Sequence, residues 1–392
     1  MGNPIPNRVG DTSPIKHVFY IIKENRTYDQ VLADLPGGDG DSSLLLFGRN
    51  ITPNQHKLAE EFILLDHFYV DAEVSADGHN WSTAAYANDY TEKTWPTHYG
   101  GRGGDYVYEG QSAAAHPQKG FLWDHAANAG VSFRSYGEFV DDYKPNIPVL
   151  KNQHCNYFTS WDEKVRDTSR FAQWRRDFDS LLAINAVPAL NTLRFINDHT
   201  EGVRKGRPTP FAHVADNDLA VGLFVDYLSK SPIWQETVVF ILEDDAQNGA
   251  DHIDAHRSTA YVAGGRVKRG FVDHTKYSTS SMLRTMELIL GMPPMSQYDA
   301  GAEPMWRCFS DTAIANGFDF VPAQVDLNQV NGTTDPKSTA YLMRMSEQLD
   351  LSKEDRANEQ LMNEILWKYV RGERAVLPAL KNAPWVRVME ID

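Results

Sequence analysis

Two adjacent carboxylates, Asp244 and Asp245, follow the apolar run ETVVFIL (236–242). Neighbouring carboxylates raise each other's pKa unless a cation lies between them. The next residues, AQNGADHIDAH, add further possible metal ligands, namely Asp251, His252, Asp254 and His256. Two interpretations remain open for this segment: a metal site built from Asp and His side chains, or a loop start in which one aspartate caps a helix.

Similar polar pairs stand after two other apolar runs. Glu24 and Asn25 come shortly after IKHVFYII (15–22), and Asp198 and His199 come shortly after LNTLRFI (190–196). A carboxylate beside an amide offers two hard oxygen ligands, although one such pair alone is better explained as a turn or a cap. The repetition of these pairs at the ends of apolar runs favours a shared metal site.

The segment VSADGHNWS (74–82) brings hydroxyls, an aspartate and a histidine close together between an apolar run and the small-residue run STAAYA. This pattern predicts a strand that passes through a tight turn, near Ser75, into a helix that begins near His79. Amides at a helix start favour an anion. Ser75 is therefore either a helix cap or a nucleophile, and the sequence alone leaves both interpretations open.

Alternating strands and helices must position these groups. Apolar runs predict the strands, and helical spacing of apolar residues predicts the helices. The predicted strands are 15–22, 64–70, 131–139, 190–196, 236–242 and 258–265, and the predicted helices are 54–64, 213–230 and 277–290. Alternation of this kind predicts a mostly parallel sheet with helices on both faces, and the functional groups of such sheets gather at the carboxyl ends of the strands.

Three segments do not fit this alternation. Residues 96–121 are rich in Gly, His and Tyr and predict a long surface or lid loop, and residues 141–190 predict an irregular, aromatic insertion. The charge-laced tail from about 338 to 370 predicts a solvated outer helix.

Composition narrows the class of protein. The chain has 392 residues, 42% of them hydrophobic, and a net charge of −15, which argues against nucleic-acid or anionic-membrane partners. No apolar run is long enough to cross a membrane. The two cysteines, Cys155 and Cys308, form either one bridge or two buried thiols. Because the first residues lack signal-peptide features, the chain is either cytoplasmic or numbered after removal of an export signal.

The order of these segments resembles the alkaline phosphatase superfamily, and within it the phosphoesterase family of bacterial phospholipases C and acid phosphatases. The motifs that carry the resemblance run from about residue 15 to about 303, and they include ENRTYD (24–29), VSADGHNWS (74–82), NDHTEG (197–202), VVFILEDDAQNGADHIDAHRS (238–258) and KYSTSSMLRTMELIL (276–290). The resemblance implies an α/β fold, a three-layer αβα sandwich with a mostly parallel central sheet and loop insertions. It also implies a single phosphoesterase domain over 1–392, with a core at about 15–303, an insertion at about 96–185 and a helical extension at about 335–392.

The resemblance also implies roles for particular residues. The Glu-Asn pair of the family maps to Glu24 and Asn25, and its acidic pair maps to Asp244 and Asp245. The superfamily turn Thr-x-Pro-Asn-His aligns with Ser75-Ala76-Asp77-Gly78-His79, which makes Ser75 the nucleophile and a metal ligand and places His79 at the histidine position; Ser82 is the alternative hydroxyl. The remaining candidates are Asp198 as a ligand of a second metal, His199 as a ligand or acid, and His252 and His256 as completing ligands.

These assignments imply a metal-dependent phosphoesterase that works through a phosphoseryl intermediate, with one or two divalent ions (Zn²⁺, Mn²⁺, Ca²⁺ or Mg²⁺). His199 or His256 would protonate the leaving oxygen or activate water, and Asn80 or Arg26 would hold a phosphoryl oxygen. The implied substrate is a small phosphate ester or a phospholipid head group.

Two alternatives stand beside this expectation: a phosphodiesterase or phospholipase C-type hydrolase, and a non-catalytic domain stabilised by metal. Because VSADGHN lacks the Pro and Arg of a sulfatase motif, a sulfatase is disfavoured. Relatives of this kind often occur fused to β-propellers in exported bacterial proteins, which implies a periplasmic or secreted location.

Overall fold

The computed structural model describes residues 3–247, 249–351 and 356–379, and its centre is a five-stranded sheet. The sheet consists, in the order β4-β7-β1-β8-β9, of β4 (Phe133–Tyr136), β7 (Leu190–Arg194), β1 (His17–Lys23), β8 (Thr237–Glu243) and β9 (Ala260–Gly264). The first four strands run parallel, and β9 runs antiparallel to β8. Because β8 is buried along its whole length, its sequence is an almost unbroken apolar run.

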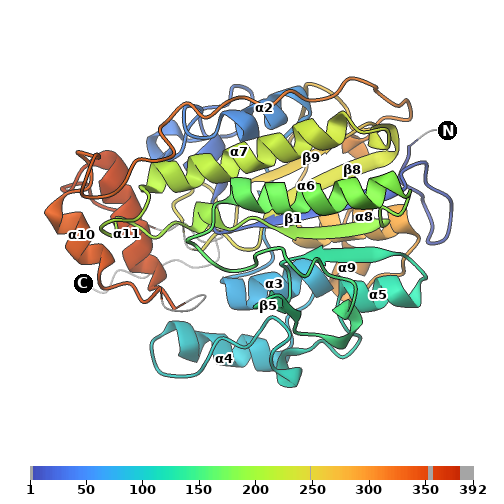
Figure 1. The fold of residues 1–392 in the computed structure, drawn as a ribbon, viewed down its shortest axis with the longest axis horizontal. Coiled ribbons are helices and arrows are strands. Elements are labelled where there is room, and N and C mark those ends of the chain that lie inside the picture. Colours follow the sequence, from blue (N-terminus) through green and yellow to red (C-terminus); the bar gives the residue numbers. More distant parts are fainter. Residues whose placement is uncertain (1–2, 248, 352–355, 380–392) are drawn as a thin grey trace.

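Helices cover both faces of this sheet (Figure 1). One face carries α2 (Pro53–Glu61), α6 (Asp167–Ala183) and α7 (Pro210–Ser229), and the other carries α3 (Ser75–Ala84), α5 (Leu122–Asn128), α8 (Thr279–Leu290) and α9 (Gln297–Gly301). Successive residues of β1 point to opposite faces. Phe19 packs edge-on against Trp174 of α6 and Phe224 of α7, whereas the Tyr20 hydroxyl donates to the backbone oxygen of Ser82 in α3. The three-layer α/β sandwich predicted from the sequence is confirmed.

Shorter strand pairs extend from this core. β2 (Ile63–Leu65) pairs in parallel with β10 (Phe271–Asp273), and β3 (Phe68–Tyr69) pairs in parallel with β11 (Tyr277–Ser278). The hairpin of β5 (Val140–Asp141) and β6 (Lys144–Pro145) is antiparallel. The single strand predicted over 64–70 is therefore two strands, which are separated at Asp66 and His67.

The remaining helices lie outside the two main layers. They are α1 (Tyr28–Leu32), α4 (Asp89–Tyr99), α10 (Ala340–Ser346) and α11 (Glu359–Arg371). Short 3₁₀ turns occur at η1 (Ser42–Leu44), η2 (Ala113–Ala115), η3 (Pro148–Leu150), η4 (Asn197–His199), η5 (Trp234–Glu236) and η6 (Trp306–Cys308).

Two expectations about the loops and the tail are wrong in part. Residues 167–183, predicted to be irregular, form α6, whose Trp174 and Phe178 stack against each other and cover the sheet. The C-terminal tail is helical as predicted, but α11 is not solvated all round. Its Ile365 and Leu366 are fully buried in a second apolar cluster that also contains Phe47.

Both cysteines are buried and free in the structure. Among the described helices, none combines the length and the apolar character needed to cross a membrane.

Candidate active site

The carboxyl ends of β1 and β8 meet at one edge of the sheet. The strands pair in register up to Lys23 and Glu243, so Glu24–Asn25 and Asp244–Asp245 emerge side by side. All four side chains are buried. Asn25 adopts a left-handed backbone conformation with a φ of 69°, which turns the chain sharply after the strand. The adjacency that the sequence implied for these two pairs is therefore built into the register of the sheet.

Ser75 reaches this edge from the first turn of α3. Its Oγ donates a hydrogen bond to Asp245 Oδ2 at 2.8 Å and lies 3.5 Å from Asn25 Oδ1. The N-cap position belongs to Val74, and the Asp77 carboxylate accepts hydrogen bonds from the amides of Glu73 and Val74. The helix begins at Ser75 rather than near His79, and the Ser75 hydroxyl is not the helix cap.

Gly78 allows α3 to approach the end of β8. A Cβ atom at this position would lie 2.9 Å from the backbone oxygen of Asp244 and 3.2 Å from its Oδ2 atom. These separations are shorter than a side-chain carbon tolerates, so a larger residue would push the helix away. The Asp-Gly pair that departs from the superfamily turn thus has two structural roles, capping by Asp77 and close approach by Gly78.

His79 lies one turn further along α3, surrounded by carboxylates. Its Nδ1 atom is 2.8 Å from Glu138 Oε1, and its Nε2 atom is 3.5 Å from Asp244 Oδ2 and 3.7 Å from Glu24 Oε1. Glu109 approaches the same nitrogen at 3.7 Å. His79 and the four carboxylates around it are completely or almost completely buried.

Arg194, the last residue of β7, is a member of the site that sequence reasoning missed. Its Nε donates to Glu24 Oε1 at 3.0 Å, its Nη1 donates to Glu109 Oε2 at 2.8 Å, and its Nη2 lies 2.8 Å from His79 Nε2. A charged residue inside the predicted strand LNTLRFI is the signal that could have identified it, because an arginine is rarely buried without a partner. Glu109 gave no comparable signal, because it lies in a loop far in sequence from the strands of the central sheet, and Glu138, two residues after β4, stands alone without a second polar ligand beside it.

Asn80 and Arg26 are held by the backbone. The Asn80 side-chain amide donates to the carbonyl oxygens of Ala76 and Tyr108, while its Oδ1 has no hydrogen-bond partner in the ranges that the structure describes. The guanidinium of Arg26 donates to the carbonyl oxygens of Asn25, Asp198 and His199. Arg26 therefore ties β1 to η4, and its contacts are those of a structural side chain.

Asp198 is paired with a lysine. Its Oδ2 atom lies 2.7 Å from Lys23 Nζ, which is also 2.6 Å from Glu243 Oε1. Burial and the nearby Glu243 raise the pKa of Asp198 to about 7, although Lys23 opposes this shift. The ammonium group of Lys23 thus balances the charge of Asp198, the residue that the sequence suggested as a ligand of a second metal.

The remaining histidines have partners of their own. His199 Nδ1 is 3.1 Å from Glu163 Oε1, and its ring packs edge-on against Trp161. His256 lies between Glu73 Oε1, 3.1 Å from Nε2, and Asp254 Oδ1, 2.7 Å from Nδ1. In the described part of the chain, His256 belongs to no compact group of metal-binding side chains.

His252 belongs to a separate group with Asp29 and Asp251. Its Nδ1 lies 2.7 Å from Asp29 Oδ2. The Arg257 guanidinium bonds both carboxylates, at 2.9 Å to Asp29 and 3.0 Å to Asp251, so a protein cation already occupies this group.

The residues at the Ser75 edge fit a divalent cation. Glu24, His79 and Asp244 each offer a ligand atom within 4.8 Å of the others, and Asn25, Ser75 and Asp245 add oxygen donors beside them. The buried carboxylates carry more negative charge than Arg194 supplies. Such an excess in a buried site is stabilised by a bound cation.

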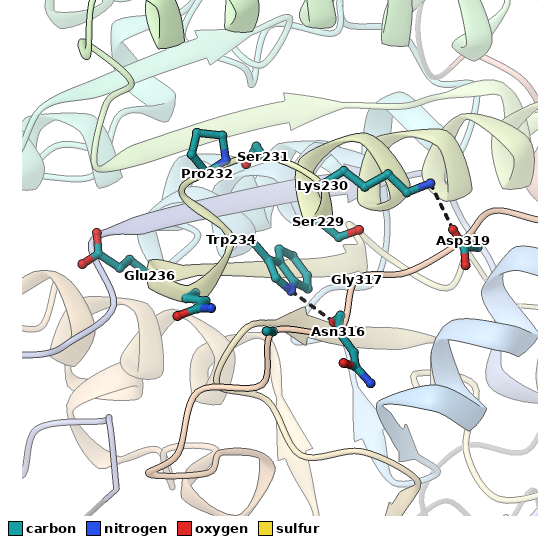
Figure 2. Close-up of a pocket in the computed structure, with 11 residues that line it drawn as sticks. Ser229, Lys230, Ser231, Pro232, Trp234, Glu236, Asn316, Gly317 and Asp319 are labelled. Carbon is teal, nitrogen blue, oxygen red and sulfur yellow. Dashed lines mark hydrogen bonds and ion pairs between the residues drawn. The ribbon is translucent and has the colours of Figure 1, made fainter.

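Two clefts in the surface lie in different places relative to this site: one at the opposite edge of the sheet and one next to the start of α3. The larger, of about 1090 Å³, lies between the end of α7, η5 and residues 315–319, at the amino end of β8 and so at the opposite edge of the sheet (Figure 2). Its polar contacts are a 3.0 Å ion pair between Lys230 and Asp319 and a hydrogen bond from Trp234 to Asn316. A cleft of about 540 Å³ lies beside Ser75 instead, lined by Glu73, Val74, Trp95 and Tyr99 and by residues of α11.

Comparison with known proteins gives one family match. Residues 38–293 match the family described as the Phosphoesterase family. Among curated proteins, none matches the sequence of this chain significantly.

Several solved structures are similar to this chain. A protein in the alkaline phosphatase superfamily from Vibrio parahaemolyticus is 17% identical, with 76% of this chain and 71% of that chain covered and a TM-score of 0.52. The structure of Ps i-CgsB is 13% identical, with 75% and 76% covered and a TM-score of 0.50. The lipoteichoic acid synthase LtaP from Listeria monocytogenes is 13% identical, with 78% of each chain covered and a TM-score of 0.47. At identities of 17% and 13%, the similarity to the Vibrio protein and to Ps i-CgsB shows a shared fold and no more.

Proposed function

Because this chain belongs to the Phosphoesterase family and has the fold of the alkaline phosphatase superfamily, it is an ester-bond hydrolase, and we propose that it hydrolyses phosphate esters with Ser75 as its nucleophile. One observation carries the proposal. Ser75 Oγ donates to Asp245 Oδ2 at 2.8 Å, at the start of α3 and inside a buried cluster of carboxylates. Family membership also disfavours the non-catalytic alternative.

The chain's own groups would support the first chemical step. Asp245 accepts the hydrogen bond of the Ser75 hydroxyl and would take its proton as the oxygen attacks phosphorus in line with the leaving group. The new Oγ–P bond replaces the P–O bond of the ester and gives a phosphoseryl enzyme. Positive charge from Arg194 and the amides at the start of α3 stabilise the negative charge that develops on the phosphoryl oxygens.

A divalent metal would be held by Glu24, Asn25, Asp244 and Asp245 together with the Ser75 oxygen. When bound, such an ion lowers the pKa of the serine hydroxyl and polarises the phosphoryl group. Because the donors are mostly oxygens, the set suits Mn²⁺ or Mg²⁺, and His79 adds an imidazole that also suits Zn²⁺.

His256 is the better placed of the two histidines to protonate the leaving oxygen. Its hydrogen bond to Glu73 raises its pKa to about 9, against the opposing effect of burial, and keeps the ring protonated at neutral pH. Glu73 also lines the cleft beside Ser75. The leaving alcohol would then depart with the proton of His256, and water would later cleave the phosphoserine and release phosphate.

The size and the lining of the same cleft indicate which kind of substrate would fit. Its volume of about 540 Å³ and its aromatic lining by Trp95 and Tyr99 suit an organic leaving group. We therefore propose a small phosphate ester or a phospholipid head group as substrate. Paired assays with p-nitrophenyl phosphate and bis-p-nitrophenyl phosphate separate a monoesterase from a diesterase of the phospholipase C type.

Ser75→Ala tests the nucleophile. We expect the turnover of p-nitrophenyl phosphate to fall by about a thousandfold or more, because the attacking oxygen is lost while the fold remains. The matched control is Ser82→Ala on the same helix, since Ser82 is buried and its Oγ has no hydrogen-bond partner within the described part of the chain.

The results distinguish three cases. Full activity of Ser75→Ala with loss of activity in Ser82→Ala would move the nucleophile to Ser82. Activity that survives complete removal of metal by chelation would contradict the proposed metal dependence. Loss of activity in Ser75→Ala with an unchanged thermal unfolding midpoint would support the proposal.

A further inference from the structure

A second cluster of metal-binding side chains lies at the ends of the short strand pair β2–β10. The register pairs Leu65 with Asp273, so the next residues, Asp66 and His274, also lie side by side. His274 Nδ1 is 2.7 Å from Asp66 Oδ2. The cluster shares no residue with the Ser75 site and follows a different pair of strands.

Two further donors face the same point. His67 Nε2 lies 3.9 Å from Asp66 Oδ1 and 3.8 Å from Asp39 Oδ2. The ligand atoms of Asp66, His67 and His274 all lie within 4.8 Å of one another. Side chains from separate segments therefore present two imidazoles and one carboxylate to one small volume, and Asp39 lies beside it, next to His67.

One buried oxygen in this cluster has no hydrogen-bond partner among the residues that the structure describes. Asp66 is completely buried. Its Oδ2 accepts hydrogen bonds from the Asp39 amide and from His274, whereas its Oδ1, which faces His67, accepts none. A buried carboxylate oxygen left in this state costs free energy, and a bound metal ion is a recognised way to satisfy such a group.

The neighbouring guanidinium does not fill this role. Arg257 donates from Nη1 to the backbone oxygens of Asp39 and Asp66, and its other nitrogens bond Asp29 and Asp251. Its hydrogen bonds position the cluster without bonding the Asp66 carboxylate. This distinguishes the cluster from the Asp29–Asp251–His252 group, in which Arg257 takes the place of a cation.

We propose that Asp66, His67 and His274 bind a Zn²⁺ ion, with Asp39 completing the coordination. Zinc bonds of about 2.0–2.2 Å in a tetrahedron separate the ligand atoms by about 3.3–3.6 Å. The observed 3.8 and 3.9 Å separations reach that range through small side-chain movements. Nitrogen donors favour Zn²⁺ over Mg²⁺ or Ca²⁺. Entry is open, because the side chains of His274 and Asp39 are 61% and 51% exposed.

The ion would act as a structural clamp. It joins the loop that carries Asp39, the junction between β2 and β3, and the segment between β10 and β11. Strands of two or three residues supply few hydrogen bonds of their own, so a metal that bonds all three segments stabilises their arrangement. The clamp does not depend on the proposed hydrolase mechanism.

The test uses the full chain freed of metal by chelation, in an Asp245→Asn background that weakens the proposed catalytic site. Zinc is titrated by calorimetry, and thermal unfolding is followed with and without Zn²⁺. We expect the double substitution His67→Gln and His274→Gln to remove one equivalent of bound Zn²⁺ and the associated rise in unfolding temperature. His154→Gln is the control, because the His154 ring bonds the backbone oxygens of Leu150 and Tyr143 and belongs to no group of metal-binding side chains in the described part of the chain.

Equal zinc stoichiometry and equal thermal shifts in the double variant and the His154→Gln control would overturn the proposal. If the double variant fails to fold, the exposed single variant Asp39→Asn decides: weaker zinc binding supports the site, and unchanged binding rejects it. Without the Asp245→Asn change, the double variant should retain turnover of p-nitrophenyl phosphate in Mn²⁺. This readout keeps failure of the clamp distinct from failure of the hydrolase mechanism.

Discussion

At the scale of single residues, the candidate active site is a cluster of buried charged side chains that depend on one another for compensation. Arg194 bonds Glu24 and Glu109, and His79 contacts further carboxylates, all out of reach of water. Removing one partner of a buried ion pair leaves the other uncompensated and typically costs about 3–5 kcal/mol. The sequence indicated the acidic residues after the strands but not Arg194 or Glu109, because pairing across 85 residues depends on how the chain folds.

The ion pair of His256 with Glu73 predicts how the stability of the protein changes with pH. Its hydrogen bond to Glu73 raises its pKa to about 9 in the folded protein, whereas an unfolded histidine has a pKa of about 6.5. The folded state therefore binds the proton more tightly, and this contribution to stability is complete below about pH 6.5 and lost as the pH rises through about 9.

We expect His256→Gln to lower the free energy of unfolding at pH 6 by about 1 kcal/mol, allowing for solvent screening at the half-exposed Glu73. The difference from the parent protein should shrink towards pH 9.5. Urea unfolding at pH 6, 7.5 and 9.5 measures both effects. A difference that stays constant over this range would show that the ion pair contributes nothing to stability.

At the scale of elements, the start of α3 combines strand, cap and helix in one short segment. The sequence predicted the turn and its position at the sheet edge, because an apolar run followed by polar and small residues is a local signal. It misplaced the helix start by about one turn, because the cap comes from Asp77 bonding backward to Glu73 and Val74. It also joined β2 and β3 into one strand, since Asp66 and His67 interrupt the pairing without a Gly or Pro to mark the break.

Gly78→Ala tests whether the close approach of α3 matters. The added carbon would lie 2.9 Å from the Asp244 backbone oxygen, so either the helix or the end of β8 must shift. We expect a loss of about 1–3 kcal/mol in stability. A displacement near 1 Å would also separate Ser75 from Asp245, and kcat/KM should fall by about a hundredfold.

Gly301→Ala serves as the control, because nothing lies within 4 Å of the carbon it adds. Its unfolding midpoint and kcat/KM should match those of the parent protein. Destabilisation of Gly78→Ala with full activity would show that the approach serves packing alone. Thermal unfolding and steady-state kinetics on the two variants decide between these outcomes.

At the scale of the whole molecule, the C-terminal helices are part of the fold around the site. The second apolar cluster packs Ile365 and Leu366 of α11 against Phe47 and Val214, which lie far earlier in the sequence. Figure 1 shows α10 and α11 together at one end of the sheet. The sequence predicted the central sheet because β1 and β8 are nearly continuous apolar runs and the other strands alternate along the chain with helical segments. The covering by α6 and α11 was not predicted, because amphipathic helices show which face is apolar but not which surface receives it.

The last prediction concerns the link from α11 to the proposed metal ligand Asn25. The Asn363 side chain donates to the backbone oxygen of Gln247 at 2.8 Å, and the Gln247 side-chain oxygen accepts from the Asn25 amide. This chain of contacts orients Asn25 with its oxygen towards Ser75. Asn363→Leu keeps the volume of the side chain but removes the hydrogen bond.

We expect Asn363→Leu to weaken metal binding by about tenfold to a hundredfold, as loss of a group that orients a ligand commonly does. Activity titrated with Mn²⁺ after chelation measures the apparent metal affinity, and activity at saturating metal should largely recover. The control on the same helix is Glu364→Gln. Glu364 forms an ion pair of 2.7 Å with Lys368, whereas the hydrogen bond to Gln247 comes from Asn363. Equal metal affinity in the two variants would mean that α11 covers the site without orienting Asn25, whereas a selective loss in Asn363→Leu would tie the C-terminal helix to the chemistry at the sheet edge.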